Sequence, residues 1–123
     1  MIALDTSVLV ESLGAGGAFR NRLRSAFKAG ERVVLPTLVL YEWVRGPRIP
    51  QELAAQEALL PSDEAIPFGA AEAALAAHLY RTLPRARGRE VELAIAACAL
   101  SWNAGVWTLN RKDFEDVPDL RLL

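Results

Sequence analysis

The chain has 123 residues, of which 52% are hydrophobic and 24% charged, and this length favours a single domain over residues 1–123. Its formal net charge of −1, from 15 acidic against 14 basic side chains, excludes a globally basic nucleic-acid binder, so any RNA contact must use a local patch. The chain has one cysteine, Cys98, and therefore cannot form an internal disulfide.

The first third of the chain shows strand and helix patterns in turn. The apolar run at 1–4 predicts a strand, and residues 6–13 predict a short helix. The glycine-rich segment 14–17 ends this helix. A second, amphipathic helix is predicted at 18–30, and a second strand follows at 32–36.

The middle of the chain is mostly helical. The helix predicted at 37–46 is apolar almost all round, which predicts burial, and another helix follows at 50–60. The segment 65–69 favours a third strand. The alanine-rich segment 70–83 has the high intrinsic propensity of a helix.

The last third begins with a basic loop at 84–89. The nearly all-apolar segment 90–103 predicts a deeply buried helix, and a fourth strand is predicted at 104–110. A short helical turn at 111–116 and a last strand at 120–123 complete the chain.

Strands that alternate with helices are typical of an α/β domain with a parallel sheet and right-handed crossovers. We therefore predict a three-layer α/β/α fold with a central parallel sheet of four to five strands. The segment 1–10 lacks the basic region of a signal peptide, and the apolar segment 33–44 is shorter than a membrane span. A cytoplasmic protein without a membrane segment is expected.

Four acidic residues do not fit their apolar surroundings. Asp5 and Asp113 follow predicted strands, at the edge where open α/β sheets bind their ligands. Glu42 and Glu92 lie in predicted buried helices, and no basic residue is embedded beside Glu42. Because an unpaired buried carboxylate is costly, such groups pair with a cation, change protonation or bind metal.

A set of carboxylates without histidine or cysteine favours a hard cation, Mg²⁺ or Mn²⁺. Such a site suits phosphodiester hydrolysis, because one ion can lower the pKa of a bound water towards about 7 and two ions can clamp the attacking and leaving oxygens. The clustered acids would repel a phosphate backbone unless metal neutralised them.

Each acid also has a structural interpretation. Asp5 could cap the helix that follows it, and Asn110 with Asp113 fits an N-cap followed by an acid three residues later. Glu92 could complement the dipole of its helix from the first turn. Glu42 is the hardest of the four to explain by structure alone. The metal hypothesis rests on the set of four.

Four segments of the chain carry a resemblance to a known family: "IALDTSVLV" at the start, "YEW", "ELAIAACAL" and "WTLNRKDFEDVPDLRL" at the end. In this order and spacing the chain resembles a PIN domain of the VapC-type branch, the toxins of type II toxin–antitoxin systems. The resemblance implies a metal-dependent endoribonuclease with clustered acids on a central parallel sheet.

Carried over residue by residue, the resemblance assigns catalysis and Mg²⁺ or Mn²⁺ binding to Asp5, Glu42, Glu92 and Asp113. Glu92 stands where the family usually has Asp, and its extra methylene extends its reach by about 1.5 Å. It would bind metal through water or leave the site less active. Glu90 is the alternative if the helix register differs.

Thr6 and Asn110 match polar positions beside the family's acids. We interpret them as groups that support the site by orienting a carboxylate or a water. Helix capping alone remains the alternative for both.

Arginines outnumber lysines 12 to 2, and several of them precede the helix that carries Glu92. Arg suits phosphate through its bidentate fork, so we expect the loop with Arg85, Arg87 and Arg89 to bind RNA. A solvated loop, or one that binds a partner, is the alternative.

The resemblance also implies a homodimer and a cognate antitoxin, whose inserted arginine would occupy the acid groove in place of metal. A second interpretation keeps the fold without efficient catalysis, as a PIN-fold module that binds RNA or a protein partner. The departure at Glu92 favours this alternative.

Overall fold

The computed structural model describes residues 1–14 and 17–123, so part of the glycine-rich break at 14–17 lies outside the described residues. The predicted helices are confirmed with ends shifted by one or two residues, and three strands form a sheet. In chain order the elements are β1 (Ile2–Leu4), α1 (Thr6–Leu13), α2 (Arg20–Lys28), β2 (Val33–Val34), α3 (Thr37–Arg45), α4 (Pro50–Leu59), η1 (Ser62–Glu64), α5 (Ala70–Thr82), α6 (Glu90–Ser101), β3 (Gly105–Trp107) and η2 (Arg111–Asp113).

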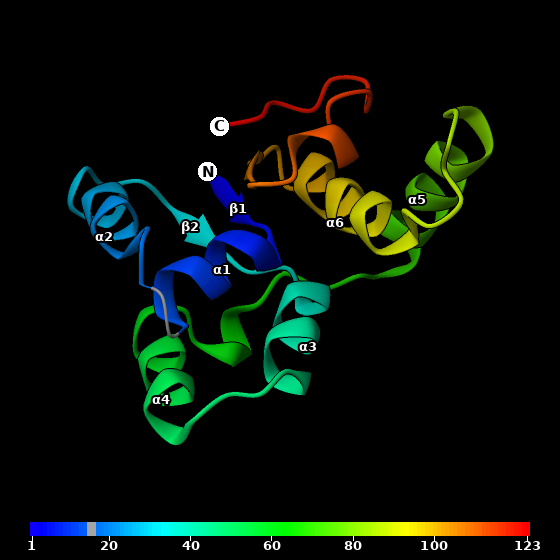
Figure 1. The fold of residues 1–123 in the computed structure, drawn as a ribbon. Helices are drawn as coiled ribbons and strands as arrows, with labels where there is room; N and C mark the ends of the chain where they lie inside the picture. The colour runs from blue at the N-terminus through cyan, green and yellow to red at the C-terminus, as the bar shows by residue number, and fades with distance from the viewer. Residues whose placement is uncertain (15–16) are drawn as a thin grey trace.

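The sheet has the strand order β2-β1-β3, and both pairings are parallel, as the alternation of strands and helices predicts. Ala3 of the central strand is paired with Val34 on one side and Val106 on the other. Because the strands run in one direction, as can be followed for β1 and β2 in Figure 1, their carboxyl ends lie at the same edge of the sheet.

The sheet has three strands rather than the predicted four to five. The two segments that were expected to add strands make single parallel bridges instead, Pro36 with Ile66 and Val106 with Leu122. Proline explains the first, because neither Pro36 nor the adjacent Pro67 has an N–H to extend the ladder. In the second, Val106 of β3 donates its N–H to the backbone oxygen of Arg121 and accepts a hydrogen bond from the N–H of Leu123, so both bonds are made on either side of Leu122.

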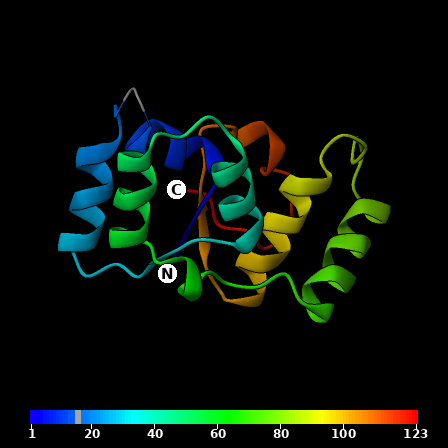
Figure 2. The same cartoon turned by 90° about the horizontal axis from the view of Figure 1, so that it is seen from below.

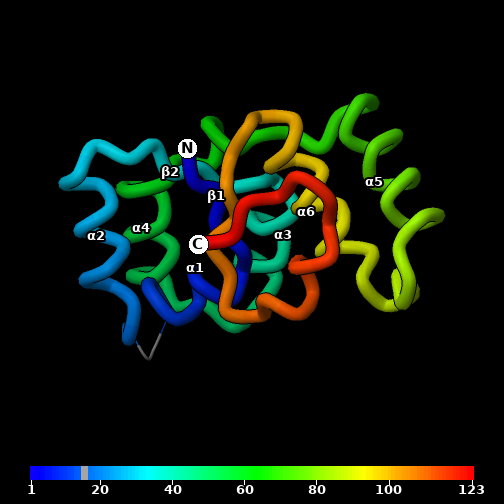
Figure 3. The backbone as a smooth tube through the Cα atoms, turned by 90° about the horizontal axis from the view of Figure 1, so that it is seen from above, coloured from blue at the N-terminus to red at the C-terminus, as the bar shows by residue number. Residues whose placement is uncertain are grey.

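Helices cover both faces of the sheet, which confirms the α/β prediction. Figures 2 and 3 show α2 and α4 on one side of the strands and α5 and α6 on the other. Residues 93–99 of α6 are all buried, in agreement with their apolar sequence. Trp43 of α3 and Phe114, just after η2, are fully buried and hold these two elements against the core. No helix in the described part of the chain has the length and apolarity to cross a membrane.

Candidate active site

Asp5 directly follows β1 and is 5% exposed. It occupies the N-cap position of α1, but its side chain makes no capping hydrogen bond. Its Oδ2 instead accepts hydrogen bonds from Ser7 Oγ at 2.9 Å and from Thr108 Oγ1 at 2.7 Å. No described residue donates a hydrogen bond to Oδ1. The two hydroxyls therefore fix the carboxylate through one oxygen and leave the other for a ligand.

Glu42 lies on α3 with its side chain 20% exposed. Thr6, the first residue of α1, donates a hydrogen bond of 2.6 Å from Oγ1 to Glu42 Oε1. Arg45, one turn further along α3, places its guanidinium 3.6 Å from Glu42 Oε2. The expectation that no basic residue lies beside Glu42 was therefore wrong, because helical spacing brings position 45 back to the same face.

Glu92 and Asp113 come from different elements. Glu92 lies in the first turn of α6, and Asp113 is the last residue of η2, and both are partly buried. Asn110 occupies the N-cap position of η2 without a side-chain capping bond. The fully buried ring of Phe114 anchors the chain directly after Asp113.

The four carboxylates act on one another electrostatically. Burial raises the pKa of Glu92, and the negative charges of Asp113, Glu42 and Asp5 raise it further. These three charges come from η2, from α3 and from the end of β1, whereas Glu92 lies on α6. The fold thus places Glu92 within electrostatic range of the other three acids that the sequence singled out.

The comparison with known families decides the class of this fold. The model of the PIN domain family matches residues 2–120. The chain belongs to the PIN-domain family. A search of curated proteins found no match.

Solved structures share the fold of this PIN domain. VapBC2 from Rickettsia felis, in a crystal structure bound to a DNA fragment from their promoter, matches with a TM-score of 0.72 and 24% identity, over 100% of this chain and 98% of that chain. DNA-bound VapBC from Salmonella typhimurium matches with a TM-score of 0.72 and 21% identity, over 99% of this chain and 96% of that chain. FitAcB from Neisseria gonorrhoeae matches with a TM-score of 0.71 and 21% identity, over 100% of this chain and 96% of that chain. At these identities the likeness shows the fold.

Hydroxyl groups support the acids of this PIN domain. Thr6 contacts Glu42 directly, whereas Asn110 acts through its backbone, whose N–H donates to Thr108 Oγ1 at 2.9 Å. Ser7 and Thr108 were missed by the sequence analysis, although both bind Asp5. The signal for Ser7 was a hydroxyl residue two positions after Asp5, and the signal for Thr108 was a hydroxyl residue inside the strand predicted at 104–110.

The three arginines expected to bind RNA differ in exposure. Arg85 and Arg87 are exposed on the loop before α6. Arg89 is 9% exposed and forms an ion pair of 2.6 Å with Asp116. Its guanidinium also donates to the backbone oxygen of Asp113 at 2.8 Å. Arg89 is therefore buried and paired within the protein, because the segment that follows β3, with Asp113 and Asp116, packs against it.

The donor set of the site fits a hard divalent cation. Carboxylate oxygens are the ligands that Mg²⁺ and Mn²⁺ prefer. The pKa of Glu92 is raised by burial and then by the charges of the other three acids, and a bound cation would offset both effects. Within the described residues no three acidic, histidine or cysteine side chains are already grouped closely enough to hold an ion. Binding would therefore require the carboxylates to draw together around it.

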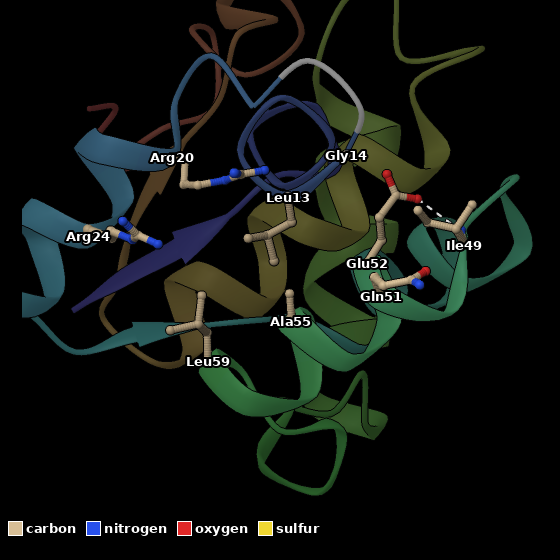
Figure 4. Close-up of a pocket in the computed structure, with 9 residues that line it drawn as sticks. All are labelled: Leu13, Gly14, Arg20, Arg24, Ile49, Gln51, Glu52, Ala55 and Leu59. Atoms are coloured by element: carbon tan, nitrogen blue, oxygen red, sulfur yellow. Dashed lines mark hydrogen bonds between the residues drawn. The ribbon is translucent and has the colours of Figure 1, made fainter.

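A separate pocket of about 430 Å³ lies between α1, α2 and α4. Figure 4 shows Arg20 and Arg24 of α2 on one side and Gln51, Glu52 and Ala55 of α4 on the other. None of the four candidate acids lines this pocket.

Proposed function

We propose that this PIN domain is a metal-dependent endoribonuclease that hydrolyses RNA phosphodiester bonds and acts as the toxin of a toxin–antitoxin pair. One observation carries the proposal: burial raises the pKa of Glu92, and the charges of three acids from other elements, Asp113, Glu42 and Asp5, raise it further. Asp5 follows β1 and Asp113 follows β3, at the carboxyl-terminal edge of the parallel sheet. The family match supports nuclease chemistry. The VapBC complexes among the structural neighbours support the toxin class.

Asp5, Glu42, Glu92 and Asp113 would hold Mg²⁺ or Mn²⁺. When bound, the ion would neutralise the acids so that a phosphate group can approach, and it would lower the pKa of a water towards about 7. Ser7 and Thr108 hold Oδ2 of Asp5, which would leave Oδ1 to bind the ion. Thr6 holds Glu42 in the same way through Oε1.

The loop before α6 would guide the RNA backbone to these acids. Arg85 and Arg87 are exposed on this loop and can each bind a phosphate through the guanidinium fork. The cytoplasmic location expected from the sequence is consistent with an RNA substrate. A single domain over residues 1–123, as the length of the chain predicts, would contain the whole family match at 2–120.

A cognate antitoxin and a second copy of this chain are the proposed protein partners. The antitoxin would block the site by placing a cationic side chain among the acids. Arg45 supports this mechanism, because its guanidinium already lies 3.6 Å from Glu42 Oε2 within this chain. A guanidinium from a partner would compete with metal for the same charge.

RNA cleavage with Mn²⁺ or Mg²⁺ tests the enzyme. Asp5→Asn removes one ligand charge while keeping the shape of the side chain, and we expect cleavage to fall by at least 100-fold with the fold intact by circular dichroism. Glu115→Gln makes the same chemical change at an exposed acid near Asp113 and should leave cleavage unchanged. Cleavage that persists in excess EDTA contradicts the metal mechanism.

Expression in a bacterial host tests the toxin. The wild-type chain should arrest growth and Asp5→Asn should not. Equal arrest by both proteins contradicts the toxin proposal. Wild-type protein that binds RNA without cleaving it supports the alternative of an inactive PIN-fold module, for which the Glu at position 92 is the favouring observation.

A further inference from the structure

Arg89 joins three segments of the chain through its guanidinium. Both nitrogens at its tip bind Asp116, with Nη1 at 3.0 Å from Oδ2 and Nη2 at 2.6 Å from Oδ1. Nη2 also donates to the backbone oxygen of Asp113 at 2.8 Å, and Nη1 donates to the backbone oxygen of Pro84 at 3.3 Å. The side chain therefore attaches the segment after β3 to the start of α6.

Stability alone explains this arrangement poorly. Arg89 is the N-cap residue of α6, where the helix dipole disfavours a positive charge. It is 9% exposed, and its buried Nε has no hydrogen-bond partner among the described residues. Burying an ion pair often brings no net gain over apolar packing, because both charges lose their hydration. A position that carries these costs points to a role beyond stability.

The place of Arg89 in the sequence suggests that role. It precedes Glu92 by three residues, about one turn of α6, and it binds the backbone of Asp113 in η2. The Arg89 guanidinium thus contacts η2, which carries Asp113, and Arg89 itself is the N-cap residue of α6, which carries Glu92. Asp113 and Glu92 repel each other as carboxylates, and the bond from Arg89 to the backbone oxygen of Asp113 opposes their separation before a cation binds.

We propose that Arg89 is a positioning residue of the metal centre, which sets the separation of Asp113 and Glu92 by clamping η2 and Asp116 to the start of α6. The proposal rests on the proposed function. Phe114 holds the same segment from the core side, and Arg89 fixes it from the side of α6. Arg89 does not contact the RNA, in contrast to the exposed Arg85 and Arg87.

The test is the affinity of the full chain for Mn²⁺, measured by isothermal titration calorimetry without RNA. Arg89→Lys keeps the charge but loses the bidentate fork, and we expect the Kd for Mn²⁺ to rise about tenfold, the usual effect of removing a group that orients metal ligands. Ile66→Val, a small truncation in the core at a residue that bonds to none of the four acids, serves as a control for lower stability and should leave the Kd within twofold.

RNA kinetics separate positioning from substrate contact. Arg89→Lys should lower kcat at subsaturating Mn²⁺, with recovery at high Mn²⁺, and should leave the KM for RNA unchanged. A raised KM with an unchanged Mn²⁺ Kd would overturn the proposal in favour of RNA contact, as the sequence first suggested. A Kd within twofold of wild type in a folded Arg89→Lys protein would also overturn it.

Asp116→Asn provides the second variant if Arg89→Lys does not fold. It leaves Arg89 in place but weakens the clamp, so the Kd for Mn²⁺ should rise about threefold, and an unchanged Kd contradicts the proposal. Wild-type protein that binds no Mn²⁺ overturns the proposed function and this inference together. Wild-type binding with unaffected variants overturns the inference alone.

Discussion

Thr108 is the buried hydroxyl that ties β3 to Asp5, and replacing it by valine tests this contact without creating a cavity. The residue is 3% exposed, and its Oγ1 donates to Asp5 Oδ2 at 2.7 Å while accepting from the Asn110 N–H at 2.9 Å. A hydrogen bond to a charged group contributes about 1.5–3 kcal/mol. Asn110 is exposed, so water can replace the partner of its N–H. We expect Thr108→Val to lower the free energy of unfolding by about 2 kcal/mol.

Urea unfolding followed by tryptophan fluorescence measures this change. Ser7→Ala removes the other donor to Asp5 Oδ2. Because Ser7 is only partly buried, we expect this change to lower the free energy of unfolding by about 1 kcal/mol. A double-mutant cycle with Asp5→Asn should show coupling between Thr108 and the charge of Asp5. A decrease below about 0.5 kcal/mol for Thr108→Val, or the same decrease in the Asp5→Asn background, would refute this reasoning.

Three further predictions concern charge and exposure. Replacing both Arg85 and Arg87 by alanine should weaken RNA binding and reduce the slope of log K against log salt by about 0.7 for each phosphate that the protein no longer neutralises, measured by fluorescence anisotropy. Arg89 lowers the pKa of Asp116, so this pair stabilises the fold above the unfolded pKa of about 4 and the stabilisation is lost as the pH falls through the folded pKa. Asp116→Asn leaves the mostly buried charge of Arg89 without its partner and should therefore cost roughly 2 kcal/mol at pH 7, and chemical unfolding should show this difference closing below about pH 4. Burial, and then the charge of Glu72, raise the pKa of Cys98 to about 11, so the native protein should react with Ellman's reagent at pH 8 only after unfolding.

The four acids were predictable from the sequence because each violates a local pattern. Asp5 ends an apolar strand, and Glu42 interrupts an apolar helix. Parallel strands bring their carboxyl ends to one edge, so residues distant in the chain could be assigned to one site before the fold was known. Their roles in metal binding and catalysis remain predictions.

The supporting contacts were less predictable, since they depend on packing between distant segments. Thr108 bonds to a residue 103 positions away, and no periodicity in the sequence marks that contact. Arg89 looked like its exposed neighbours Arg85 and Arg87, because a basic loop does not show which side chain will be covered by a later segment. The ion pair with Asp116, 27 positions further on, distinguishes it.

The strand count shows a different limit. Segments 65–69 and 120–123 have the apolar composition of strands, but each makes one bridge. Prolines at positions 36 and 67 remove the N–H groups that a longer ladder would need. The apolar composition therefore correctly predicted that these two segments lie beside the sheet, but it overestimated the number of residues in each that pair with a strand.

The most direct test of the central claim is the location of Mn²⁺ in crystals of the wild-type protein, from its anomalous scattering. We predict a peak among Asp5, Glu42, Glu92 and Asp113, with carboxylate oxygens at about 2.0–2.3 Å and Asp5 Oδ1 as a ligand. The same crystals of Asp5→Asn should show a weaker peak or none. Mn²⁺ bound elsewhere at saturating concentration, with these four carboxylates free of it, would contradict the account.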